Sequence, residues 1–418
     1  MGPGDAQANF YSCPAPLRVL WFVRKKKVVR HARYQKFDYK NRGNRKTKKS
    51  GPHLRDVDIF KAYFDGENLK EDELDKRDAC ICQCGRGNCT RRELLTRFLF
   101  LNAVLDQGPD MEGVRQLLCD TVNDLYRRQI RILHNPEQFF ASLNIAMDKI
   151  STLHESIRFA REPAWQNKNN SKKSYNLYIE GSQTLGYALG RWGTPLAVPM
   201  ILAARNPGNP NALIDYLESF ASSEIMSQEI KDDKDIGLGK AIGDKAAHLF
   251  AKWIIHTFPL ARRPDASWDR YSFEIPVDSN VGRILWRTGF LLECADESEY
   301  KKKEVIQMGK GKNGANYIRA TNIRGMTTDI LDDAEKEIYK DLCKNHFRKN
   351  KRNIEIQKIP SVFLMQDGHF GTGDLDDGLM YIGTEFCFNT DTPKCDECPL
   401  KDMCRGCHEK RLITDYKT

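Results

Sequence analysis

A group of cysteines near the C-terminal end constrains the fold of this chain more than any other feature of its sequence. In CFNTDTPKCDECPLKDMC, four cysteines are separated by gaps of seven, two and five residues. Thiols held this closely on a loop can surround one metal centre, because the short gaps leave little chain entropy to lose. Zinc and a [4Fe–4S] cluster both accept four cysteines, and the spacing does not choose between them. A set of reduced surface cysteines is the alternative, which such tight grouping disfavours.

This segment resembles the iron–sulfur loop of the endonuclease III family. Cys398-Pro399-Leu400 matches the family's Cys-Pro-Leu, and LMYIGTEFC resembles its approach to the first ligand. The first gap is one residue longer than the family's. The resemblance implies a [4Fe–4S] cluster on four ligands and leaves Cys407 spare. These ligands are Cys387, Cys395, Cys398 and Cys404.

Two further segments resemble the same family, that of the helix-hairpin-helix DNA glycosylases. GKAIGDKAAHLFAKWII resembles the hairpin turn and its second helix, with Ile242 and Gly243 at the positions that present backbone N–H groups to a DNA phosphate. Lys245 falls where bifunctional members carry their lysine nucleophile. FEIPVDSNVGRILWRTGFL resembles the segment with the catalytic aspartate, which predicts Asp278 at a helix N-cap. The simpler interpretation is that Asp278 only caps the helix.

The resemblance implies a DNA N-glycosylase that flips a base out of the duplex and cuts its glycosidic bond. LNAVLDQGPD resembles the loop that fills the vacated space, with Gln107 as the candidate wedge and Asn102 as its neighbour. Attack by Lys245 would form a Schiff base and nick the strand; without it, water would be the nucleophile. The sequence leaves the excised base open. The rival hypothesis is a non-catalytic iron–sulfur protein that binds nucleic acid.

Helical periodicity begins at Arg91, in RRELLTRFLFLNAVLDQG, and alternating strand patterns are scarce after it. We therefore expect a mainly α-helical, two-module helix-hairpin-helix glycosylase fold, with DNA in the cleft between the modules. The expected segments are a basic extension over 1–90, the helical core over 91–290, a lysine-rich insertion over 291–370 and the cluster loop and tail over 371–418. Within the extension, LRVLWFVRKKKVV favours a strand or two.

The basic extension also bears on partners. The chain has a formal net charge of +9, and clusters such as Arg24–Lys27 and Arg45–Lys49 suit a polyanion. A solvated leader or a targeting signal is the alternative. CICQCGRGNC is a candidate zinc site through Cys80, Cys82, Cys84 and Cys89. We expect an intracellular monomer associated with double-stranded DNA and not with a membrane, in the cytoplasm and nucleoid, or in the nucleus of a eukaryote.

Overall fold

The computed structural model of the protein describes a little under half of the chain. The described residues are 91–105, 133, 141, 196–233, 236–238, 242–258, 260–261, 274–294, 297–300, 306–310, 316–320, 332–345 and 371–414. The basic extension, the strand expected near its start, the first cysteine cluster (Cys80, Cys82, Cys84 and Cys89) and Gln107 lie outside them.

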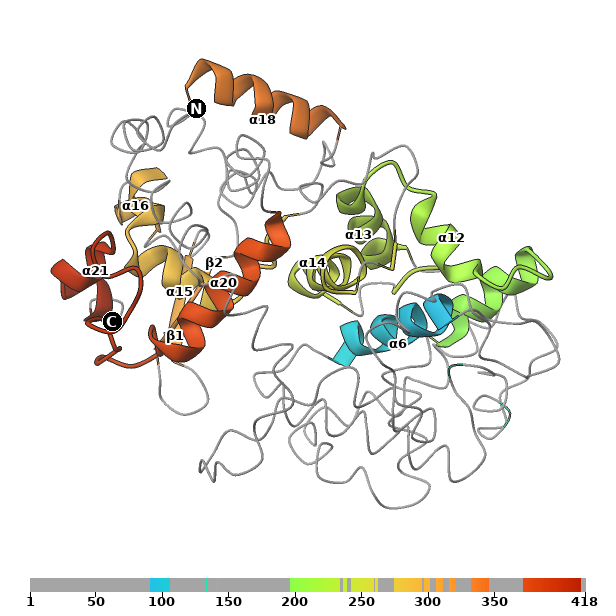
Figure 1. The fold of residues 1–418 in the computed structure, drawn as a ribbon, viewed down its shortest axis with the longest axis horizontal. Coiled ribbons are helices and arrows are strands. Elements are labelled where there is room, and N and C mark those ends of the chain that lie inside the picture. Colours follow the sequence, from blue (N-terminus) through green and yellow to red (C-terminus); the bar gives the residue numbers. More distant parts are fainter. Residues whose placement is uncertain are drawn as a thin grey trace, which may run out of the picture. The chain divides into compact units, whose positions relative to one another are not determined.

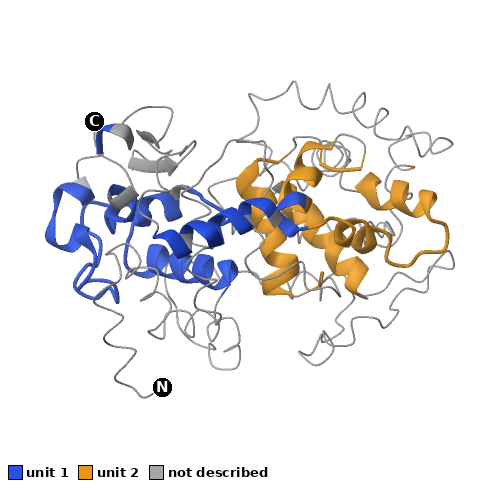
Figure 2. Ribbon diagram, turned by 90° about the horizontal axis from the view of Figure 1, so that it is seen from above, with its two compact units in different colours: residues 1–45, 222–225, 265–418 blue, residues 46–221, 226–264 orange. Residues whose placement is uncertain are grey.

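Contacts divide the chain into two compact units. Unit 1 comprises residues 1–45, 222–225 and 265–418, and unit 2 comprises residues 46–221 and 226–264 (Figure 2). Residues 91–290, which the sequence suggests as one helical core, are therefore shared between both units. Each unit is described by itself below.

The described residues are mainly helical, which confirms the predicted fold class at that level. One antiparallel ribbon accompanies the helices: β1 (Ile306–Lys310) pairs with β2 (Asn316–Ala320), with Ile306 opposite Ala320. The sequence analysis did not predict it. Among the described helices, none has the length and apolar character needed to cross a membrane.

Unit 2 is organised around α6 (Arg91–Leu105), which packs against α12 (Ala212–Glu218), α14 (Asp244–Lys252) and the π-helix η3 (Trp253–Thr257) (Figure 1). Leu94, Phe98 and Leu101 follow the three- and four-residue spacing of the sequence, and all are buried. The rings of Phe100 and Phe250 meet edge to face, with centroids 5.4 Å apart. Residues 196–205 form another helix of this unit.

A buried carboxylate connects α6 to the start of α12. Glu93 accepts hydrogen bonds from the backbone N–H groups of Leu213 and Ile214 at 3.2 and 3.1 Å. Arg97, one turn further along α6, donates to the same carboxylate at 2.8 Å and to the Leu133 carbonyl at 2.9 Å. Glu93 thus satisfies two N–H groups that have no partner within their own helix, and Arg97 compensates its charge.

Unit 1 is organised around α15 (Ser279–Arg287), which contacts α20 (Thr372–Glu385), α16 (Phe290–Cys294), α22 (Arg411–Thr414) and β2 (Figure 1). Gly289 ends α15 with a φ of +83°, the left-handed conformation that glycine adopts without strain. The other helices of this unit are α17 (Glu297–Tyr300), α18 (Asp333–Asn345) and α21 (Arg405–His408). The remaining described helix is α13 (Ser223–Asp232), whose first three residues fall in unit 1 and whose other residues fall in unit 2.

Candidate active site and metal centre

The predicted catalytic carboxylate begins the central helix of unit 1. Asp278 is the N-cap of α15, and its Oδ1 accepts hydrogen bonds from the backbone N–H groups of Asn280 at 2.8 Å and Val281 at 2.9 Å. This confirms the predicted cap. The side chain is half-buried, so it combines a fixed position with access to solvent. A carboxylate held in this way can act electrostatically on a ligand without reorganising.

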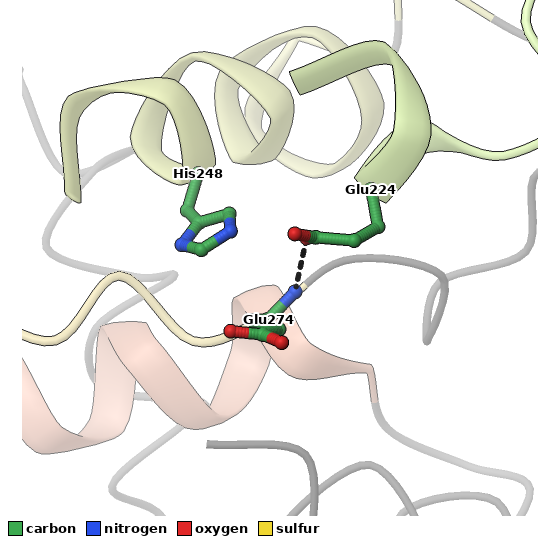
Figure 3. Close-up of side chains that lie close together, drawn as sticks. All are labelled: Glu224, His248 and Glu274. Atoms are coloured by element: carbon green, nitrogen blue, oxygen red, sulfur yellow. Dashed lines mark hydrogen bonds between the residues drawn. The ribbon is translucent and has the colours of Figure 1, made fainter. Parts of the chain in front are cut away.

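The segment that leads into Asp278 is itself held by a buried acid. The Glu224 carboxylate accepts a hydrogen bond from the backbone N–H of Glu274 at 3.1 Å (Figure 3). Glu274, Ile275 and Pro276 are all buried. His248, also drawn in Figure 3, belongs to unit 2, where its Nε2 lies 3.3 Å from the Gln228 amide nitrogen.

Asn280 and Arg283 connect the start of α15 to α20. Arg283 donates to the Asn280 side-chain oxygen and, through Nε, to the Cys387 carbonyl at 2.9 Å. The Asn280 amide also contacts Met380 Sδ at 3.4 Å. Gly383 makes room for this amide, because a Cβ there would lie 2.1–2.4 Å from its atoms. Asn280 is therefore packed between α15 and α20.

Arg287, at the other end of α15, holds the start of the cysteine loop (residues 386–404). Only 1% of this arginine is exposed. Its guanidinium donates to the carbonyls of Phe388 at 2.6 Å and Thr390 at 2.9 Å, and lies 3.6 Å from the Cys387 sulfur. Planar, charge-assisted donation to several acceptors suits arginine and not lysine. One helix therefore carries Asp278 at its first turn and anchors the cysteine loop at its last.

Five thiols line a single hollow in unit 1, which we call the five-thiol hollow. It contains about 360 Å³ not filled by protein atoms, part of it open to solvent, and Ile284, Ile382 and Leu400 contribute apolar walls. The thiols are those of Cys387, Cys395, Cys398, Cys404 and Cys407. The structure therefore brings together the four predicted ligands, and adds the cysteine that the sequence analysis left spare. Soft thiolates around a hollow with partly apolar walls fit a zinc ion or an iron–sulfur cluster.

The thiols of this hollow differ in acidity. Burial raises the pKa of Cys398 to about 12 and also raises that of Cys395. A hydrogen bond from the Cys407 thiol lowers the pKa of Cys404 to about 7, and the same hydrogen bond raises the pKa of Cys407. A metal must displace protons from the thiols that it binds, so occupation of this hollow would be favoured as pH rises.

In unit 2, the other predicted residues surround the start of α14. Ile242 is buried, while Gly243 is exposed and forms the N-cap without a side-chain hydrogen bond. Lys245 is the second residue of the helix and is half-buried. Asp244 beside it forms an ion pair with Lys231 of α13. Lys245 belongs to unit 2 and Asp278 to unit 1. The surroundings of each residue are therefore described only within its own unit.

Asn102, the proposed neighbour of the wedge, is buried within unit 2. It lies inside α6 with 1% of its surface exposed, and within the part of the chain that the structure describes neither amide atom has a hydrogen-bond partner. A residue buried to this degree reaches a ligand only if its helix moves.

The contacts of Arg283 and Arg287 in α15, and the position of Cys407 in the five-thiol hollow, were not predicted from the sequence. Arg283 and Arg287 are four residues apart in the second half of α15, where the other residues are apolar, and this spacing puts both on one face. Buried arginines need partners, so this pair was a signal for a contact with polar backbone elsewhere. Nothing local to these residues indicated that the contact is the cysteine loop.

Gly406→Ala is expected to destabilise unit 1. The added Cβ would lie 2.7 Å from the Arg287 carbonyl oxygen, and neither backbone segment can yield easily because Arg405 N–H also donates to Thr288 at 3.3 Å. Overpacking of this kind typically lowers the free energy of unfolding by about 1–3 kcal/mol. Urea denaturation followed by tryptophan fluorescence would measure it. Gly243→Ala is the control, since nothing lies within 4 Å of its added Cβ; equal stability of the two variants would contradict the prediction.

No family model matches the chain, and no curated protein or solved structure matches it either.

Proposed function

We propose that this chain is a DNA N-glycosylase of the helix-hairpin-helix class with a metal-bound cysteine loop. The observation that carries the proposal is the organisation of α15. Asp278 begins the helix with its carboxylate fixed by two backbone N–H groups, and Arg287 ends it against the loop that bears the predicted ligands. The same order of hairpin, aspartate and cysteine loop is the one that the sequence resemblance implies.

The proposed chemistry is cleavage of an N-glycosidic bond. As the bond breaks, positive charge develops on the sugar, and the Asp278 carboxylate stabilises it electrostatically. In the bifunctional route the Lys245 amine forms a bond to C1′ while the bond from C1′ to the base breaks. The sugar ring then opens to give a Schiff base between Lys245 and C1′, as the two protons of the amine pass to the departing base and to the ring oxygen. Loss of a proton from C2′ then eliminates the 3′ phosphate, which nicks the strand. If Lys245 does not attack, water takes its place and the strand stays intact.

The start of α14 would contact the DNA backbone. Gly243 is exposed and offers no side chain in front of the first N–H groups of the helix, which makes this terminus suitable for a phosphate. Asp244 would repel a phosphate, and its ion pair with Lys231 compensates that charge. Among the residues predicted for the hairpin, Gly243 has the surroundings that best suit a contact with phosphate.

A [4Fe–4S] cluster would be held by Cys387, Cys395, Cys398 and Cys404, and zinc is the alternative occupant. When bound, the group would supply rigidity to the cysteine loop. Lys394 and Lys401 are exposed on the loop and would be its contacts with DNA phosphates, although Lys394 lies 3.8 Å from Glu397 and the loop also carries exposed Asp391, Asp396 and Asp402. Measurement of iron, zinc and acid-labile sulfide in the purified protein distinguishes the two occupants, because a cluster contains iron and sulfide and a zinc site contains neither.

The base-release test uses duplex oligonucleotides that carry oxidised pyrimidines, mismatched thymine, uracil or adenine, or modified cytosines, with borohydride present to trap an imine. We expect one base to be released and a covalent adduct to form. Lys245→Ala should abolish the adduct, whereas Lys340→Ala, which removes an exposed lysine of α18, should leave it intact. Base release without any adduct would contradict the lysine mechanism and leave a glycosylase that uses water.

The second candidate function is non-catalytic binding of nucleic acid. The observation in its favour is that Asp278 already has a structural task, since its Oδ1 accepts two hydrogen bonds at the helix start. Binding of DNA without release of any base from the panel would support this candidate.

A further inference from the structure

The five-thiol hollow holds one thiol more than a four-coordinate centre uses. Cys407 is placed against two of the predicted ligands, because its side chain makes hydrogen bonds with the thiols of Cys404 and Cys395. A cysteine unrelated to the metal would not be expected to line the same hollow as four others.

The backbone explains why Cys404 and Cys407 point the same way. Cys404 is the N-cap of α21 and Cys407 lies three residues later, so the two side chains share one face of a single helical turn. The Cys407 N–H donates to the Cys404 carbonyl at 3.0 Å. Gly406 packs this turn closely against the end of α15. A Cβ added to Gly406 would lie only 2.7 Å from the Arg287 carbonyl oxygen. The turn thus presents two thiols to the hollow at once.

We propose that Cys407 is a substitute metal ligand, which completes a four-thiolate centre in the five-thiol hollow when Cys404 is released or lost. The proposal rests on the metal centre of the proposed function. In the exchange, the bond from the metal to the Cys404 sulfur breaks and a bond to the Cys407 sulfur forms. One proton passes from the Cys407 thiol to the departing Cys404 thiolate, and no electrons are transferred.

Cys398 provides the contrast within the same hollow. It is the most buried of the five cysteines, and the side-chain hydrogen bonds of Cys407 go to Cys404 and Cys395 instead. Cys395 lies on the same turn, since the Cys398 N–H donates to the Cys395 carbonyl at 3.1 Å, but Cys395 is itself a predicted ligand and cannot replace Cys398. The structure therefore distinguishes a replaceable ligand, Cys404, from an irreplaceable one, Cys398.

The experiment compares metal content in full-length protein purified without oxygen. Iron, zinc and acid-labile sulfide per chain would be measured for wild type, Cys404→Ala, Cys407→Ala, the Cys404→Ala/Cys407→Ala double variant and Cys398→Ala. Both single variants of the exchange pair are expected to keep most of the wild-type metal. The double variant and Cys398→Ala should lose it about tenfold or more, because changes in outer-shell partners alone already lower metal affinity by about 10–100-fold. Circular dichroism checks that each variant is folded.

Alkylation of the metal-loaded proteins followed by mass spectrometry reads the exchange directly. In wild type, Cys407 should be labelled and Cys404 protected; in Cys404→Ala, Cys407 should become protected. A Cys404→Ala protein as empty as Cys398→Ala, beside a loaded wild type, would overturn the substitution and leave the four-cysteine centre standing. A wild type that binds neither iron nor zinc would overturn the metal centre itself, and the substitution with it.

A second measurement does not depend on the folding of Cys404→Ala. Loaded wild type and Cys407→Ala would be exposed to the same chelator, and the rate of metal loss compared. The variant is expected to lose metal several-fold faster, since a released Cys404 would have no replacement. Equal rates would overturn the proposal.

Discussion

Asp278→Asn is expected to reduce base release by about 10³-fold or more while leaving the protein folded and able to bind DNA. Removal of one preorganised electrostatic group from a catalytic site typically costs about 10²–10³ in rate, and loss of a full charge opposite a developing cation should lie at the upper end. Asparagine keeps the Oδ1 acceptor and caps helices about as well as aspartate. The two hydrogen bonds to Asn280 and Val281 should therefore survive.

Single-turnover kinetics on the substrate identified in the panel would measure this loss, and fluorescence anisotropy would measure DNA binding. Asp374→Asn is the matched control. Asp374 accepts a hydrogen bond from the Gly371 N–H at 2.9 Å near the start of α20, so this variant alters a helix-end carboxylate away from Asp278. Base release unchanged in Asp278→Asn would mean that Asp278 serves only as a cap and that it does not take part in catalysis.

Arg287→Met is expected to detach the cysteine loop from α15 and to abolish metal binding. Methionine fills much of the volume, but it cannot donate to the Phe388 and Thr390 carbonyls or to the Cys387 sulfur. Hydrogen bonds from a charged donor contribute about 1.5–3 kcal/mol each, and buried acceptors left without a donor add a penalty. The expected loss in the free energy of unfolding is about 2–4 kcal/mol.

Metal content and urea denaturation would both report this change. Arg405→Met is the matched control, because Arg405 pairs with Glu409 at 2.9 Å while both side chains are about one-third exposed. An exposed pair of this kind contributes about 0–1 kcal/mol, so the control should keep its metal. If the two variants retained metal and stability equally, Arg287 would not be the anchor of the loop.

The features that were predicted from the sequence are those with local signals. The apolar spacing after Arg91 indicated α6, and the Pro-Val-Asp-Ser pattern indicated the N-cap at Asp278. The short gaps between cysteines indicated a common site, and the four thiols do line one hollow. Local spacing works here because chain connectivity alone brings these groups together.

The features that were missed depend on partners far away in the chain. Arg283 and Arg287 contact residues about a hundred positions later, and Glu93 caps a helix 120 positions later. No local pattern records such a pairing. The ribbon of β1 and β2 is different, because its signal was present: two five-residue runs, 306–310 and 316–320, are joined by five residues that contain Gly311 and Gly314, and a short glycine-containing connection indicates a hairpin.

The long separation between α15 and the cysteine loop has a consequence for biosynthesis. As the chain is made from its N-terminus, α15 emerges before the carbonyls that its arginines require, and the last of these belongs to Thr390. Until then, a helix that later becomes buried carries two guanidinium groups whose acceptors in the cysteine loop have not yet been made. The intervening segment adds little to the equilibrium cost of closure, since doubling a loop adds only about 0.6 kcal/mol. Contacts between such distant residues instead slow folding. A chain terminated shortly before Cys387 would therefore retain α15 in a form that favours aggregation or proteolysis.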